Sequence, residues 1–151
     1  MANVILAEHT AAVEMTIDLD ALASSEAGVG RQSTIVSNTN NAQIIHLFVQ
    51  ILTGTTPAID TNIFVYLIKS DGTHRSDGAG ASDAGITIVN APLLGVIRMN
   101  SASTGQEFHG EFTIYNPGIE WGIAIVQDTV ATLGAGSAMR VAYVVENQEV
   151  Q

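Results

Sequence analysis

Cysteine is absent from the sequence, which excludes disulfides and thiol chemistry but does not identify a cellular compartment. Basic residues are also scarce, because five cations against fifteen acidic residues give a net charge of −10. The cations are scattered along the chain: Arg31, Lys69, Arg75, Arg98 and Arg140. A phosphate backbone is bound by clustered lysine and arginine, so the composition argues against direct binding of nucleic acid and against attachment to anionic lipid.

Long apolar runs are missing as well. No stretch approaches the ~20 apolar residues that a transmembrane helix needs. The N-terminus lacks the basic segment of a secretory signal peptide, so we expect none. Charged residues make up 13% of the chain, about half of the usual ~25%. Such a weakly charged surface suits a protein that covers much of itself with partners.

Helical periodicity is absent, and the apolar residues instead form short runs bounded by turn residues. Residues 121–126, which hold the only tryptophan, follow an Asn-Pro-Gly turn. This run predicts a strand that is buried on both faces, or on one face and at an interface. The runs 108–115 and 139–145 flank it, and we predict that the three strands form a β-meander.

Further strands are predicted along the rest of the chain. Residues 13–20 alternate strictly between apolar and polar, which is typical of a half-buried strand. The runs 43–52 and 62–69 are apolar on both faces, so both faces must be covered. Shorter strands are expected at 33–36, 86–89 and 92–99, and residues 21–31 and 74–85 are expected to form loops. The whole predicts an all-β, jelly-roll-like antiparallel sandwich of seven to nine strands in residues 13–151, preceded by an N-terminal arm at residues 1–12.

Two groups of polar residues are candidate sites of chemistry. Asp71, Asp77 and Asp83 could hold calcium, or could form the turns of a solvated loop. Glu107, His109 and Glu111 share one face of a strand, where they could bind a metal or simply form its polar side. A metal-dependent enzyme would require these three residues to converge with His46.

The remaining histidines and the only tryptophan also have structural interpretations. His46 lies in a very apolar strand and is better explained as a core or interface residue, and His9 and His74 lie in segments expected to be flexible. Trp121 with Tyr115 could form a sugar platform, or could pack in the core. No nucleophile motif is present, and each polar group above has a simpler structural interpretation. We therefore expect no catalytic residue, cofactor or metal site, and no enzymatic activity.

Strands that are apolar on both faces are aggregation sites unless they are paired or covered. The simplest solution is assembly into a homo-oligomer, with a trimer favoured, or packing onto a larger particle. The candidate interface residues are Val4, Ile5, Leu6, His46, Phe48 and Trp121.

Three segments carry a resemblance to a known class of proteins. They are residues 64–78, residues 91–97, and residues 120–128 with the closing run 139–144. Over residues 62–145 the chain resembles small β-sandwich structural proteins of tailed bacteriophages, of the capsid decoration or cement class. The resemblance implies a non-enzymatic virion protein that binds the major capsid protein on the outer surface of the shell. The alternative is a carbohydrate- or receptor-binding module of a virion fibre or tail, which predicts an exposed Trp121, whereas the structural role predicts a buried one.

Overall fold

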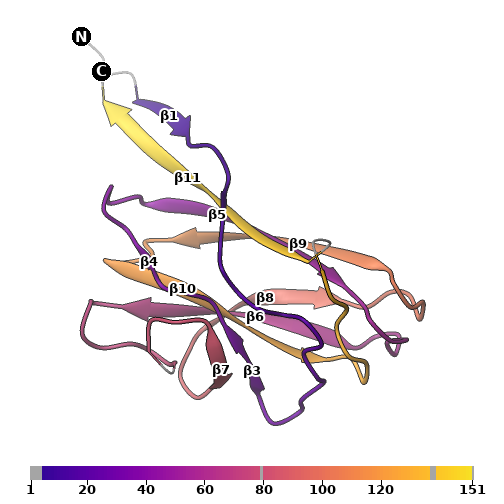
Figure 1. Ribbon diagram of the computed structural model, residues 1–151. Helices are drawn as coiled ribbons and strands as arrows, with labels where there is room; N and C mark the ends of the chain where they lie inside the picture. The colour runs from indigo at the N-terminus through magenta and orange to yellow at the C-terminus, as the bar shows by residue number, and fades with distance from the viewer. Residues whose placement is uncertain (1–4, 79, 137–138, 151) are drawn as a thin grey trace.

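The computed structural model describes residues 5–78, 80–136 and 139–150, with only the backbone described at 5–7 and 148–150. Two antiparallel sheets stack face to face (Figure 1). The five-stranded sheet contains β1 (Ile5–His9), β2 (Val13–Glu14), β5 (Ile44–Leu52), β9 (Glu107–Tyr115) and β11 (Arg140–Val150). The six-stranded sheet contains β3 (Val29–Gln32), β4 (Val36–Ser37), β6 (Asn62–Ser70), β7 (Ala84–Thr87), β8 (Leu93–Arg98) and β10 (Glu120–Asp128). In the described part of the chain, no helix is long and apolar enough to cross a membrane.

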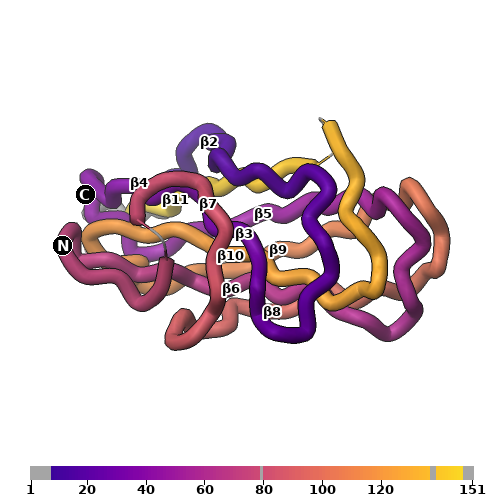
Figure 2. Tube along the Cα trace, turned by 60° about the horizontal axis from the view of Figure 1, so that its bottom comes forward, coloured from indigo at the N-terminus to yellow at the C-terminus, as the bar shows by residue number. Residues whose placement is uncertain are grey.

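The strand order is that of a jelly roll. The five-stranded sheet has the order β1-β11-β5-β9, with β2 also paired to β11. The six-stranded sheet has the order β7-β3-β10-β6-β8, with β4 also paired to β10. If β1 and β2 are taken as two pieces of one strand, and β3 and β4 as two pieces of another, eight strands remain beside β7. Strand β7 lies at the edge of its sheet, next to β3 (Figure 2). The predicted all-β, jelly-roll-like sandwich is confirmed.

The predicted meander is wrong, and the structure has two strand segments that the sequence did not predict. The eleven strands include β1, which forms within the expected N-terminal arm, and β3, most of which lies in the expected loop at residues 21–31. The strands β9, β10 and β11 are consecutive in sequence but are not neighbours, since β10 lies in the opposite sheet from the other two. A turn signal marks a reversal of the chain, but it does not say in which sheet the next strand lies.

The predicted alternation of burial holds for residues 15–20, whereas Val13 is exposed, and the segment pairs with a neighbouring strand only at Val13–Glu14. The segment crosses from one sheet to the other. The amide of Met15 donates to the carbonyl of Val141 at 2.9 Å, and the carbonyl of Thr16 accepts from the amide of Thr34 at 2.9 Å. Met15 and Leu19 are both buried. The period-two pattern therefore reports an extended segment over a core, even where no continuous ladder forms.

The core lies between the sheets and is centred on β10, whose seven middle residues are all buried. Trp121, Ile123 and Ile125 face the five-stranded sheet, while Ala124 packs on the other side with Ile68 and Ile86. Burial of this strand on both faces is thus confirmed. The cluster of Ala124, Ile68 and Ile86 also buries part of the outer face of β6. Less of the apolar surface of β6 is therefore left for a partner to bury than its sequence suggested.

Candidate functional site

The face of the five-stranded sheet that points away from the core carries an exposed aromatic side chain beside charged groups. Along β5 every second residue is buried, which leaves Phe48 on the outer face with 40% of its surface exposed. A groove of about 440 Å³ crosses this face. Its lining includes Phe48, Gln50, His109, Glu111, Arg140 and Ala142.

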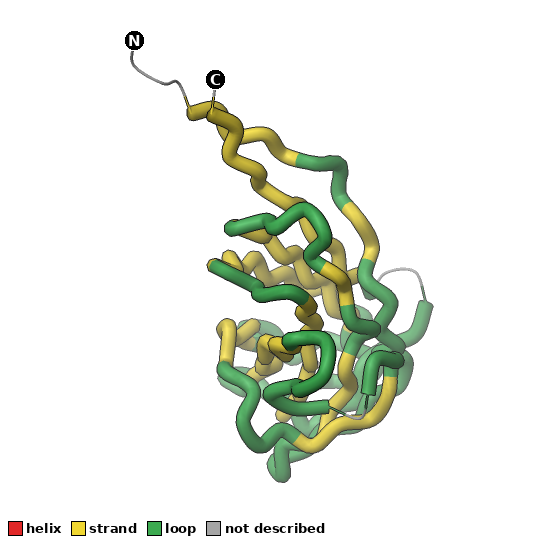
Figure 3. The backbone as a smooth tube through the Cα atoms, turned by 90° about the vertical axis from the view of Figure 1, so that its left-hand side faces the viewer, coloured by secondary structure: helices red, strands yellow, loops and turns green. Residues whose placement is uncertain are grey.

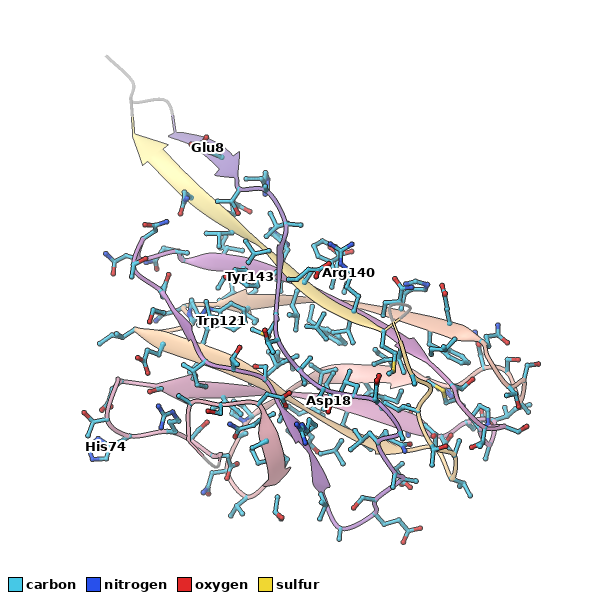
Figure 4. The ribbon with its side chains drawn as sticks, viewed as in Figure 1. Glu8, Asp18, His74, Trp121, Arg140 and Tyr143 are labelled. Atoms are coloured by element: carbon cyan, nitrogen blue, oxygen red, sulfur yellow. The ribbon has the colours of Figure 1, made fainter. Side chains whose placement is uncertain are left out.

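The strand register explains the composition of the groove. Phe48 pairs with Glu111 of β9 on one side and with Ala142 of β11 on the other, so the ring lies between a carboxylate and a methyl group. Arg140 lies at the border, where its Nε contacts the Glu14 carboxylate at 2.8 Å. Figure 4 shows Arg140 on this outer side of the sheet. The groove has an apolar floor and charged residues at its borders. This combination is more typical of a surface that binds another protein than of a catalytic site.

Glu107, His109 and Glu111 occupy alternate positions of β9, as predicted, with the His109 Nε2 3.9 Å from a Glu107 oxygen. His46 does not join them. It pairs with Thr113, whereas His109 pairs with Gln50, four residues further along β5. The convergence that a metal-dependent enzyme would need at these four residues is therefore not formed.

His46 instead lies in a different cluster, with His9 and Glu146. The three residues come from β5, β1 and β11, which are adjacent in the sheet. His46 Nε2 lies 3.2 Å from Glu146 Oε2, and the His9 and His46 ring centroids are 5.7 Å apart. One ligand atom from each residue lies within 4.8 Å of the other two. Among the described residues, this is the only group of three or more histidine or acidic side chains with such spacing.

No pattern in the sequence connects these three residues. His9 lay in the expected arm, Glu146 lay in the expected polar tail, and His46 was interpreted as a core or interface histidine. The antiparallel register places His9 opposite Glu146, and His46 opposite Val144. Because Val144 and Glu146 are two residues apart on one strand, all three side chains share the outer face. Only knowledge of the strand pairing could have identified the cluster.

The three aspartates of the glycine-rich segment do not converge on one point. Asp77 Oδ2 accepts the amides of Val89, Asn90 and Ala91 at 3.0, 2.6 and 2.5 Å. Asp83 contacts the Arg31 Nε at 2.6 Å. Asp77 and Asp83 therefore hold the segment against neighbouring parts of the chain, which gives both carboxylates a structural role.

The carboxylate of Asp71 caps its own turn, and this predicts a low titration midpoint. The amides of His74 and Thr73 donate to Oδ1 at 2.6 and 2.8 Å. These hydrogen bonds lower the pKa of Asp71 from an ordinary value of 3.8 to about 2. The stabilisation of the turn should therefore be complete above about pH 4 and lost as the pH falls through about 2. An NMR titration of the Asp71 carboxyl carbon tests this, and a midpoint at or above 3.8 would contradict it.

The remaining candidate interface residues differ from one another in their exposure. Trp121 is only 1% exposed, and its ring meets Tyr143 edge-on with centroids 5.0 Å apart (Figure 4). It is therefore a core residue in this chain, and it cannot form an exposed platform with Tyr115. Phe48 is exposed, whereas Val4 lies outside the described residues, and the side chains of Ile5 and Leu6 are also not described.

Residues 5–8 of β1 and 147–150 of β11 form what we term the terminal ribbon. The register pairs Ile5 with Val150 and Glu8 with Asn147. Strand β5 pairs with β11 only up to Glu146, so in the described residues the ribbon consists of two strands alone. It projects beyond the stacked sheets in Figures 1 and 3. The expected N-terminal arm thus includes a strand that pairs with the C-terminal strand of the same chain.

No protein-family model and no curated protein matches the chain.

Proposed function

We propose that this chain is a non-enzymatic structural protein of a virion, which binds the outer surface of a capsid shell and stabilises it. The observation that carries the proposal is the terminal ribbon. A two-stranded ribbon is at best marginally stable in water and gains stability when a further strand or surface covers it. A protein that carries such a projection beyond a complete sandwich has a built-in element for joining a larger assembly.

The contact we propose is strand addition to the free edge of β1. In the five-stranded sheet β1 is the terminal strand, and among the described strands only β11 pairs with it. The amide of Thr10 donates to the Val145 carbonyl at 3.0 Å. Since antiparallel donors alternate along a strand, the amides of Ala7 and His9 point away from β11, toward the free edge. An extended segment of the major capsid protein would pair with these groups.

The charge of the ribbon narrows the chemistry of that partner. The ribbon, residues 5–8 and 147–150, includes two glutamates and no lysine or arginine. We therefore propose that the capsid segment carries lysine or arginine beside its pairing backbone, because like charges placed opposite each other destabilise a sheet. The groove around Phe48 supplies a second, apolar contact on the same sheet. Burial of apolar surface contributes about 25 cal/mol per Å², and many copies on one particle multiply the total effect.

The test is co-sedimentation of the purified chain with shells assembled from the major capsid protein of the virus that encodes it. Ala7→Pro removes an amide from the free edge without touching the ladder to β11, so we expect at least tenfold weaker binding and an unchanged thermal midpoint. Ala7→Val keeps the amide and should bind like the unmodified chain. If the chain does not sediment with shells, or if Ala7→Pro binds as well as Ala7→Val, the proposed contact is wrong.

A further inference from the structure

We infer that His9, His46 and Glu146 bind one divalent transition-metal ion, of which zinc is the best match, at the base of the terminal ribbon. The inference stands on side-chain geometry and does not depend on the proposed role in a virion. The cluster brings two imidazoles and one carboxylate together from three adjacent strands. Such a donor set suits zinc and other late first-row transition metals, whereas calcium and magnesium prefer oxygen donors.

The distances fit a metal site that needs only small side-chain rotations. Zinc binds imidazole nitrogen and carboxylate oxygen at about 2.0–2.2 Å, so neighbouring ligands in a tetrahedral site lie roughly 3.3–3.5 Å apart. His46 Nε2 and Glu146 Oε2 already lie 3.2 Å apart. The third ligand atom lies within 4.8 Å of both, and it belongs to His9, which is exposed and free to rotate toward them.

Burial and strand position favour metal binding at this cluster over the other histidine–carboxylate pairs. The side chains of His46 and Glu146 are 25% and 17% exposed, so two of the three ligands are held by their surroundings. The pairs His74–Asp71 and His109–Glu107 are much more exposed. Each of these pairs also lacks a third ligand within reach, among the described residues. Three protein ligands leave one tetrahedral position for water or for a group from a partner.

A bound ion would connect the ribbon to the body of the sandwich. His9 is the last residue of β1, and Glu146 is the last residue of β11 that pairs with β5. The ion would thus join β1, β11 and β5 at the point where the ribbon leaves the sheet. Because the metal binds the ordered ribbon and not a frayed one, it should stabilise the β1–β11 pairing by mass action.

The experiment uses the full chain without an affinity tag, since a histidine tag would bind the probe itself. Isothermal titration with Zn²⁺ should show one site per chain, while Mg²⁺ and Ca²⁺ at the same concentrations should show none. His9→Gln, His46→Gln and Glu146→Gln should each weaken zinc binding at least about tenfold, because even changes around a metal ligand commonly cost 10–100-fold. The control variants His74→Gln and His109→Gln should bind zinc like the unmodified chain.

A second measurement separates the proposed site from binding to scattered histidines. Zinc should slow hydrogen exchange at the amides of β1 and of residues 146–150, and this protection should disappear in His9→Gln. His9 is exposed, so that variant is expected to fold even if a change at His46 disturbs the sheet. The inference is overturned if zinc does not bind at one site per chain. Equal loss of binding in His9→Gln and His109→Gln, or zinc binding without ribbon protection, would also overturn it.

Discussion

Replacing Trp121 with alanine should lower the free energy of unfolding by about 3–5 kcal/mol, the range expected when a large aromatic residue is removed from a core. The indole is 1% exposed and lies between the two sheets. Its edge-on contact with Tyr143, which bridges β10 and β11, would be lost as well. Few neighbours could move into the space, because β10 is held on both sides by other strands and the cavity would remain.

Urea unfolding followed by circular dichroism measures this effect, since the variant loses the only tryptophan as a fluorescent probe. The matched control is Tyr115→Ala, because Tyr115 is 69% exposed and should change stability by no more than about 0.5 kcal/mol. Trp121→Phe should fall between the two, as it keeps an apolar ring but leaves part of the volume empty. A loss below 1 kcal/mol in Trp121→Ala would contradict the placement of the indole in the core.

The fold class could be predicted because it depends on local patterns that this sequence carries clearly. The run at residues 43–52 and the alternation at residues 13–20 each report which side chains face a core. The turn signals give the number of reversals to a good approximation. Sheet membership could not be predicted in the same way, because it depends on pairings between residues far apart in the chain. The misplaced β-meander at β9, β10 and β11 is the direct result.

The candidate sites likewise differ in whether they depend on one strand or on the pairing of several strands. The shared face of Glu107, His109 and Glu111 follows from a period of two within one strand, and it was predicted. The cluster of His9, His46 and Glu146 needs the register of two separate strand pairs, and a slip of one residue in either would move a side chain to the other face. No periodicity in the sequence holds that information.

Glycine gives a further example, because Gly28 and Gly30 both lie in the segment 21–31, which is expected from the sequence to form a loop. Gly28 does adopt a left-handed backbone, with φ of +74°. Gly30 has a different role, since it lies inside β3, next to the central strand β10. A Cβ atom at Gly30 would lie 2.2 Å from the carbonyl oxygen of Ile125 and 2.8 Å from a methyl of Val126. Glycine is therefore required here for close approach of two backbones.

Gly30→Ala should consequently destabilise the protein by about 3 kcal/mol, near the upper end of the usual cost of overpacking a core. The clash is with backbone, and Ile125 is fixed in place by its pairing with Val65 of β6, so no rotamer change can relieve it. The matched control is Gly85→Ala on the neighbouring strand β7. Gly85 pairs with Arg31, and a Cβ atom there would meet nothing within 4 Å.

The control should leave stability unchanged or raise it by about 0.4–1 kcal/mol, because alanine restricts the unfolded chain more than glycine does. Both variants keep Trp121, so urea unfolding followed by tryptophan fluorescence compares them directly. A difference between Gly30→Ala and Gly85→Ala of less than about 1 kcal/mol would mean that β3 and β10 are not packed as closely as described. A large difference would show that the close packing of β3 on β10 excludes every side chain at position 30, which no local feature of the sequence reveals.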